Sequence, residues 1–184
     1  MLKRIPVVLT DKDEENKKIV LSFLDAQRNR DEKTLVLLIH EDYSPWDYQL
    51  PFSEIDQRVV TPDLEFPLES GREAFIKRLK QDWVTYTHPV VNVKKMMVKD
   101  GEVWVWYHIS GYQTGPFMNI PPTNKLLEFD FNSIFQIKDG KIFRAGGVRS
   151  GSVLFQMGKL IVEENNEETI RLYMKKLREM GIIN

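Results

Sequence analysis

The sequence contains no cysteine, and this absence excludes several kinds of chemistry at once. Disulfide bonds, thiolate metal sites, iron–sulfur clusters and cysteine nucleophiles all require that residue. Long hydrophobic runs are also missing: the longest aliphatic stretch, Leu35–Ile39, is far shorter than the ~20 residues that span a bilayer. Met1–Thr10 lacks the apolar core and cleavage site of a secretory signal. These absences predict a soluble, cytoplasmic protein.

An excess of charge of one sign is absent as well. Lys and Arg number 26 against 27 Asp and Glu, which gives a formal net charge of −1. A nucleic-acid-binding domain usually carries a strong basic excess, and a membrane-surface helix a basic face. The chain also lacks a phosphate-binding loop, a nucleophile elbow and a dinucleotide fingerprint, and its three histidines do not have metal-ligand spacing. We therefore expect no metal, no other cofactor, and neither nucleic acid nor membrane as a partner.

The 184 residues have the length and composition of one globular domain, 1–184, with 42% hydrophobic and 29% charged residues. The first part of the chain has the period of amphipathic helices. Thr10 or Asp11 can begin one helix and Asp31 a shorter second one, and Ser70 and Glu73 have capping-box spacing for a third. Residues 43–69 form an insertion rich in proline and aromatics, typical of lids, binding loops or oligomer contacts.

From Pro89 onward the apolar pattern changes to that of strands. Asp100-Gly101 and Asp139-Gly140 each join two β-rich segments, and Asp-Gly favours the type I′ turn of a tight hairpin. The pattern predicts an antiparallel meander of at least four strands, and then an amphipathic C-terminal helix over residues 165–181. The fold class is α+β: a curved antiparallel sheet packed on N-terminal helices, with a pocket at its open end.

One segment is distinctive. Residues 111–125 read GYQTGPFMNIPPTNK, and Glu128-Phe129-Asp130 and Gly140-Lys141-Ile142 follow. With these motifs and His40-Glu41-Asp42-Tyr43, the sequence over residues 12–158 resembles the SnoaL-like polyketide cyclases and ester cyclases of the nuclear transport factor 2-like superfamily. The resemblance implies a cone-shaped α+β barrel with an apolar cavity for a hydrophobic small molecule. It also implies a homodimer through the outer face of the sheet.

The sequence departs from the family's pattern at the positions that handle protons. The family's acid/base pair is a His in its G-T-H-T-G segment and an Asp after G-K-I, and this sequence has Gln113 and Ser150 there. The family's usual Trp falls on Gly146, and its His after the D-Y segment falls near Trp46. Gln cannot exchange a proton near neutral pH, and Ser without a base is a poor acid or base. The cyclase mechanism therefore cannot be transferred as it stands.

Two other residues are candidates for catalysis. Asp130 lies on an otherwise apolar strand, and inside a pocket its carboxylate would supply the function lost at position 150; the alternative is a solvated polar stripe. His108 shares a strand face with Trp104 and Trp106. If that face lined the cavity, His108 would be the leading general base. We expect instead that the alternate aliphatic face lines the cavity and that Trp104 and Trp106 form a dimer interface.

The remaining candidates would line the pocket. Gln113 either orients a ligand carbonyl or pairs with the backbone. Arg149, which follows Gly146-Gly147, either clamps a carboxylate or phosphate at an enlarged cavity mouth beside Ser150, or is solvated next to a β-bulge. Tyr107 and Trp83 either stack a planar ligand or belong to the core.

Three functions follow from this sequence. The first is a lyase- or isomerase-like enzyme, of cyclase, isomerase or hydrolase type, acting on a hydrophobic carbonyl compound. The second is a non-catalytic binder of an apolar small molecule, and the third is a protein-interaction module that docks through its aromatic loop or terminal helix. An enzyme predicts an ionisable group in the pocket, a binder predicts only neutral polar groups there, and an interaction module predicts a filled cone.

Overall fold

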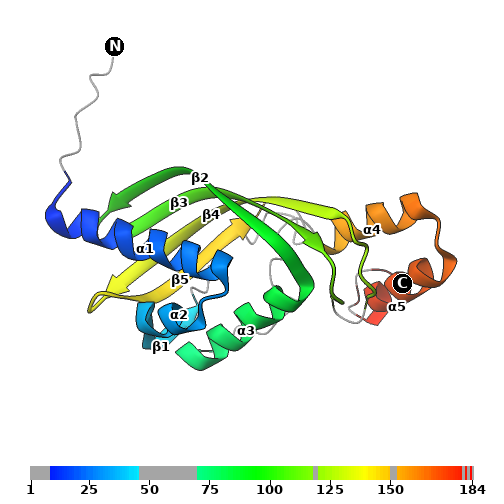
Figure 1. Cartoon of the computed structure of the whole chain (residues 1–184), viewed down its shortest axis with the longest axis horizontal. Coiled ribbons are helices and arrows are strands. Elements are labelled where there is room, and N and C mark those ends of the chain that lie inside the picture. The colour runs from blue at the N-terminus through cyan, green and yellow to red at the C-terminus, as the bar shows by residue number, and fades with distance from the viewer. Residues whose placement is uncertain are drawn as a thin grey trace, which may run out of the picture.

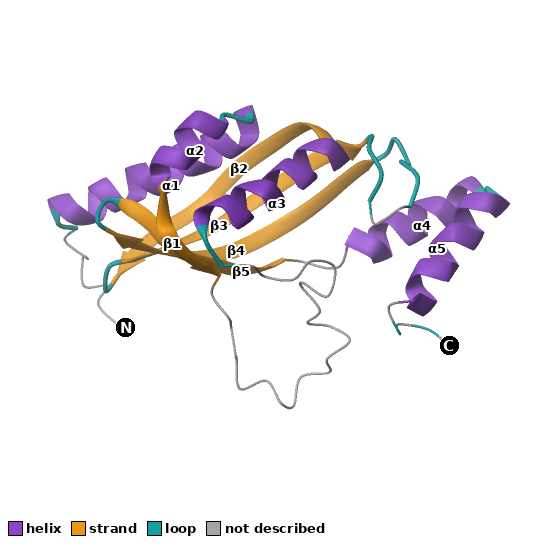
Figure 2. Ribbon diagram, turned by 90° about the horizontal axis from the view of Figure 1, so that it is seen from below, coloured by secondary structure: helices purple, strands orange, loops and turns teal. Residues whose placement is uncertain are grey.

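The computed structural model describes residues 9–45, 70–117, 120–149 and 153–179, together with Gly181 and Ile183. A five-stranded sheet carries three helices on one face, and two further helices lie beyond its end (Figure 1, Figure 2). The predicted α+β class is confirmed. Most of the 43–69 insertion, from Trp46 onward, and Ser150 lie outside the described residues, and so do the side chains of Val148 and Arg149.

Two of the three N-terminal helices begin at the residues that the sequence indicates. Helix α1, Asp11–Asn29, has Thr10 as its N-cap: the Thr10 hydroxyl accepts from the Asp13 amide, and the Asp13 carboxylate accepts from the Thr10 amide. It ends at Arg30, which has a left-handed backbone with φ 58°. Helix α2, Glu32–Leu38, has Asp31 as its N-cap. Both caps satisfy amides that a helix start leaves unbonded.

Helix α3, Arg72–Thr85, begins differently from the prediction. Its N-cap is Gly71, with φ 98° and no side-chain cap, so the capping box expected from Ser70 and Glu73 is wrong. The helix starts one residue too late for that box, because three residues after Gly71 stands Ala74 rather than an acid. The Gly71 amide instead donates to the Tyr43 carbonyl at 2.6 Å, which ties the helix start to the first strand.

The strand order in the sheet is β1-β5-β4-β3-β2. Strands β2 to β5 form the predicted antiparallel meander, and both Asp-Gly turns have positive φ at each central residue. Strand β1 pairs parallel with β5, so the sheet is mixed rather than purely antiparallel. The sequence did not predict β1, since it lacks the alternation of a strand. The strands are β1 Ile39–Pro45, β2 Tyr86–Lys99, β3 Glu102–Gln113, β4 Leu126–Lys138 and β5 Lys141–Arg149.

Strand β3 shows which face of the sheet is covered. Val103, Val105 and Tyr107 are buried in the core cluster that also contains side chains of α1, α2 and α3, whereas Trp104 and Trp106 on the opposite face are 41% and 45% exposed. The expected register, with the aliphatic face inward, is confirmed. We call the covered face the inner face of the sheet and the other its outer face.

The C-terminal part consists of two helices, α4 (Val153–Glu164) and α5 (Glu167–Glu179), which we call the C-terminal hairpin. Only the second was predicted from the sequence, since α4 is short, largely apolar and carries Gly158 near its middle, so its residues are hard to tell from a buried strand. The hairpin packs against the end of the sheet and the loop 114–125, in a second core cluster separate from the first (Figure 1). No helix among the described residues has the length and hydrophobicity to cross a membrane.

Candidate functional site

A buried polar pair interrupts the apolar inner face of the sheet. The hydroxyl oxygens of Tyr107 on β3 and Ser133 on β4 lie 3.0 Å apart, and both residues are buried. The Tyr107 ring stacks on Phe131, with ring centroids 5.4 Å apart. Burial raises the pKa of the Tyr107 phenol, although the hydrogen bond to Ser133 lowers it in part. At neutral pH the pair therefore offers uncharged hydroxyl groups beside an aromatic surface.

Gly147 makes room for this pair. It lies opposite Ser133 in the ladder between β4 and β5, and a Cβ at position 147 would come 2.5 Å from the Ser133 Oγ. The bulge considered for Gly146-Gly147 is not present, because the ladder continues through both glycines and its irregularity lies between Gln136 and Ile137. The backbone of Arg149 continues the ladder opposite Phe131.

Trp83 carries a buried donor next to the same cluster. It lies in the last turn of α3 and, like Phe131, packs against the core cluster that contains Tyr107. Its indole Nε1 is buried and has no hydrogen-bond partner within the described part of the chain. A buried donor without a partner costs about 1–3 kcal/mol, and an indole nitrogen can only donate. An acceptor on a bound molecule would remove that cost.

Both polar atoms of the Gln113 side-chain amide are hydrogen-bonded to the backbone. It is fully buried, its Nε2 donates to the Gly115 carbonyl at 2.7 Å, and its Oε1 accepts from the Thr123 amide at 2.6 Å. Backbone bonds from Gln113 to Asn124 and Lys125 close the same loop. Of the two interpretations open for this residue, the geometry favours pairing with the backbone: Gln113 joins the two ends of the loop 114–125.

The two predicted catalytic residues lie together on the outer face. His108 Nδ1 is 3.1 Å from Asp130 Oδ1, and His108 Nε2 is 3.5 Å from Glu128 Oε1. The side chains of His108 and Asp130 are 29% and 46% exposed. Alternate residues of a strand point to opposite faces, so neither shares the face of Tyr107. The pocket position considered for Asp130 is therefore not observed, and a catalytic role for either residue stays a prediction.

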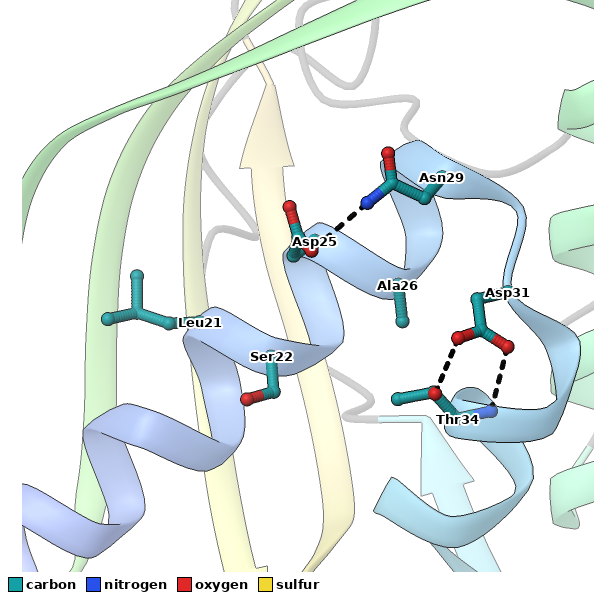
Figure 3. Close-up of a pocket in the computed structure, with 7 residues that line it drawn as sticks. All are labelled: Leu21, Ser22, Asp25, Ala26, Asn29, Asp31 and Thr34. Carbon is teal, nitrogen blue, oxygen red and sulfur yellow. Dashed lines mark hydrogen bonds between the residues drawn. The ribbon is translucent and has the colours of Figure 1, made fainter.

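A hollow of about 420 Å³ lies between α1 and α2 (Figure 3). Its carboxylates already accept hydrogen bonds from residues of the same two helices: Asp25 accepts from the Asn29 side chain, and Asp31 accepts from the amide and hydroxyl of Thr34. The sequence does not single out this hollow, since its lining consists of ordinary residues of α1 together with the N-cap and first turn of α2. Neither in this hollow nor elsewhere in the described ranges do three His, Asp or Glu side chains gather as a metal site requires. The inner face, with its buried donor, is the better candidate for a binding site.

Comparison with known proteins assigns the fold and the family. The structure resembles a candidate SnoaL-like polyketide cyclase from Jannaschia sp. CCS1, with a TM-score of 0.67 and 16% identity over 84% of this chain and 97% of that one. It also resembles TsrD from Streptomyces laurentii, with a TM-score of 0.61 and 18% identity over 84% of this chain and 98% of that one.

A third similar structure is AclR, a candidate hydroxylase from Streptomyces galilaeus, with a TM-score of 0.62 and 16% identity over 79% of this chain and 97% of that one. At such identities these likenesses concern the fold alone. No curated protein sequence matches the chain. The sequence model of the SnoaL-like polyketide cyclases matches residues 33–148, well over half of the chain, and the protein therefore belongs to that family.

Proposed function

We propose that this protein binds a hydrophobic small molecule with a carbonyl group at the inner face of the sheet, where Trp83 and Phe131 pack against the core cluster that contains Tyr107. The observation that carries the proposal is the buried indole N–H of Trp83, which lacks an acceptor among the described residues. A ligand carbonyl would accept this hydrogen bond, and the stacked rings of Tyr107 and Phe131 would contact its planar apolar part. Membership of a family that binds small molecules supports the same conclusion.

The polar groups at this place favour binding over proton transfer. Indole, phenol and aliphatic hydroxyl are all uncharged at neutral pH, and burial raises the pKa of the Tyr107 phenol further. The family's proton-handling positions hold Gln113 and Ser150 here, and the His108–Asp130 pair lies on the outer face. We therefore favour a binder, and cyclase, isomerase or hydrolase chemistry on the same ligand would need a proton-transfer group supplied by the ligand itself.

Two probes of nearly equal shape test the proposal. 2-Acetonaphthone has a carbonyl where 2-ethylnaphthalene has a methylene, so calorimetric titration with both isolates the hydrogen bond. We expect the wild type to bind the ketone with a Kd about fivefold lower or more, which corresponds to about 1 kcal/mol for the hydrogen bond. Trp83→Phe should abolish this preference, because it keeps an aromatic ring and removes the N–H.

Trp106→Phe is the matched control, since Trp106 lies on the outer face and is 45% exposed. It should leave the preference for the ketone unchanged. Failure of the wild type to bind either probe would contradict the proposal, and so would an undiminished preference in Trp83→Phe.

We also propose that a second copy of the chain covers the outer face. Met97 on β2 and Trp104 on β3 are paired across the outer face, and both are among the exposed large hydrophobics, whereas Ile134, opposite Trp104 on β4, is buried. Adjacent Trp106 extends the patch. A large exposed apolar patch on a sheet marks an interaction site, and the family resemblance implies a dimer through this face.

Sedimentation velocity measures this dimer. Trp104→Glu places a charge in the patch and should reduce the sedimenting mass from dimer to monomer. Val162→Glu is the control, because Val162 is exposed on α4, outside the patch. A wild-type monomer, or an undiminished dimer mass in Trp104→Glu, would refute the proposed interface.

A further inference from the structure

We propose that the C-terminal hairpin is the end wall of the ligand site and limits how long a ligand the site accepts. The inference rests on the proposed binding function, because it concerns the same inner face. The hairpin begins at Val153, beyond the family match over residues 33–148. It therefore lies outside the segment that the family model matches.

A row of aromatic rings leads from the polar pair to the hairpin. The Tyr107 ring stacks on Phe131, and Phe131 contacts Phe129 edge-on, with ring centroids 6.4 Å apart. Phe131 packs against both core clusters, and Phe129 is buried in the cluster that contains the hairpin. A planar ligand lying along this row from Tyr107 would meet the hairpin at its far end. The hairpin contributes four buried side chains to that cluster: Met157, Ile161, Tyr173 and Leu177.

The loop 114–125 connects the proposed donor to this wall. On one side the Gly115 amide donates to the Thr85 carbonyl at 3.1 Å, and the Thr85 hydroxyl donates to the Pro116 carbonyl at 3.2 Å. Thr85 ends α3, two residues after Trp83. On the other side Phe117 and Ile120 are buried against the hairpin. Because Gln113 joins the two ends of this loop, it is a positioning residue for the wall.

Specific polar bonds dock α4 on the sheet. Gln156 Nε2 donates to the Glu128 carbonyl at 2.5 Å, and Gln156 Oε1 accepts from the Glu128 amide at 3.2 Å, so one amide side chain satisfies both backbone groups of a β4 residue. Lys125 and Glu164 add an ion pair of 3.1 Å between the loop and the end of α4. A hairpin attached in this way is a fixed part of the site and not a loose extension.

Within the hairpin the two helices fit closely. Gly158 of α4 lies against the ring and hydroxyl of Tyr173 on α5, and a Cβ at position 158 would overlap both. A close-packed contact of this kind does not yield gradually to a ligand, since added volume forces neighbouring groups to shift. A ligand longer than the row of rings must therefore displace the hairpin.

The test compares a two-ring ketone, 2-acetonaphthone, with its linear three-ring analogue, 2-acetylanthracene. We expect the wild type to bind the shorter ketone at least about tenfold more tightly, as overpacking requires. Gln156→Ala removes the two hydrogen bonds to Glu128. It should reduce the ratio of the affinity for the two-ring ketone to that for the three-ring ketone by about fivefold or more, because only the longer ketone should bind more tightly. Lys159→Ala, an exposed position on the same helix, should leave the ratio unchanged.

A second readout needs no variant. Hydrogen exchange of the wild-type chain, saturated with each ketone in turn, should show faster exchange of residues 156–179 with the three-ring ketone than with the two-ring ketone. Equal ratios in wild type and Gln156→Ala, together with equal exchange in both complexes, would overturn the inference and leave the binding function standing. Failure of the wild type to bind either ketone would overturn the proposed function and this inference with it.

Discussion

Strands β3 and β4 carry two polar pairs on opposite faces of one sheet. The two pairs have nearly the same atom-to-atom distance but differ in burial, so comparing them shows what burial alone contributes. The Tyr107 and Ser133 hydroxyls lie 3.0 Å apart on the inner face, and His108 and Asp130 lie 3.1 Å apart on the outer face. The first pair is buried and the second partly exposed. A hydrogen bond in a low-dielectric interior is strengthened, and an unmade one is costly, whereas water competes for a polar contact that is partly exposed. Only the inner pair should therefore matter greatly for stability.

The largest effect is expected from removing the inner aromatic side chain. Tyr107→Ala should lower the free energy of unfolding by roughly 3–5 kcal/mol, because it leaves a cavity between the sheet and its helices. Tyr112→Ala is the matched control on the same strand, since Tyr112 is 47% exposed, and it should cost less than about 1 kcal/mol. Urea unfolding measures both. Equal losses would mean that the two faces do not differ as described.

Removing only the inner hydroxyl should have an intermediate effect. Tyr107→Phe leaves the Ser133 hydroxyl without its Tyr107 partner and should cost about 1–2 kcal/mol of unfolding free energy. In a Ser133→Ala background the same change should cost less, because no buried partner is abandoned. A double-mutant cycle in urea measures this coupling, and strictly additive effects would contradict a functioning hydrogen bond.

Alkaline pH sharpens the comparison further. Burial raises the pKa of Tyr107 above its ordinary value of 10.0, so above about pH 10 the unfolded chain loses a proton that the folded chain retains. Stability contributed by this group is complete below pH 10 and falls as the pH rises towards the folded-state pKa. Urea midpoints from pH 8 to 11 should fall more steeply in wild type than in Tyr107→Phe. Parallel curves would contradict the burial of the phenol.

The smallest effect is expected on the outer face. A double-mutant cycle of His108→Gln and Asp130→Asn should give a coupling below about 1 kcal/mol, because both side chains are partly exposed and screened by solvent. Adding salt should reduce it further. A coupling as large as that of the inner pair would reverse the ranking of the two faces.

Local features of this fold were predictable from the sequence, and features that depend on distant pairing were not. Asp139-Gly140 fixes its hairpin through backbone preference alone, and Thr10 and Asp31 cap helices within one turn. Strand β1 was missed because its partner, β5, lies about a hundred residues further along the chain, and no local pattern encodes a parallel pairing.

The candidate site shows the same division. The period of β3 placed Tyr107 inward and Trp104 outward correctly. The partner of His108 could not be predicted, because a long loop joins β3 to β4 and leaves their register open, whereas a tight turn would have fixed it. The bonds of Gln113 and the buried N–H of Trp83 depend on tertiary packing and have no signal in the sequence.

The measurement that tests the central claim most directly is the NMR signal of the Trp83 indole N–H. The chain has four tryptophans, so ¹⁵N-labelled protein gives four indole signals, which Trp→Phe variants assign. The account predicts that titration with 2-acetonaphthone moves the Trp83 signal downfield, as a new hydrogen bond does, and leaves those of Trp104 and Trp106 in place. A Trp83 signal that stays unmoved at saturation, while an outer-face tryptophan shifts, would contradict it.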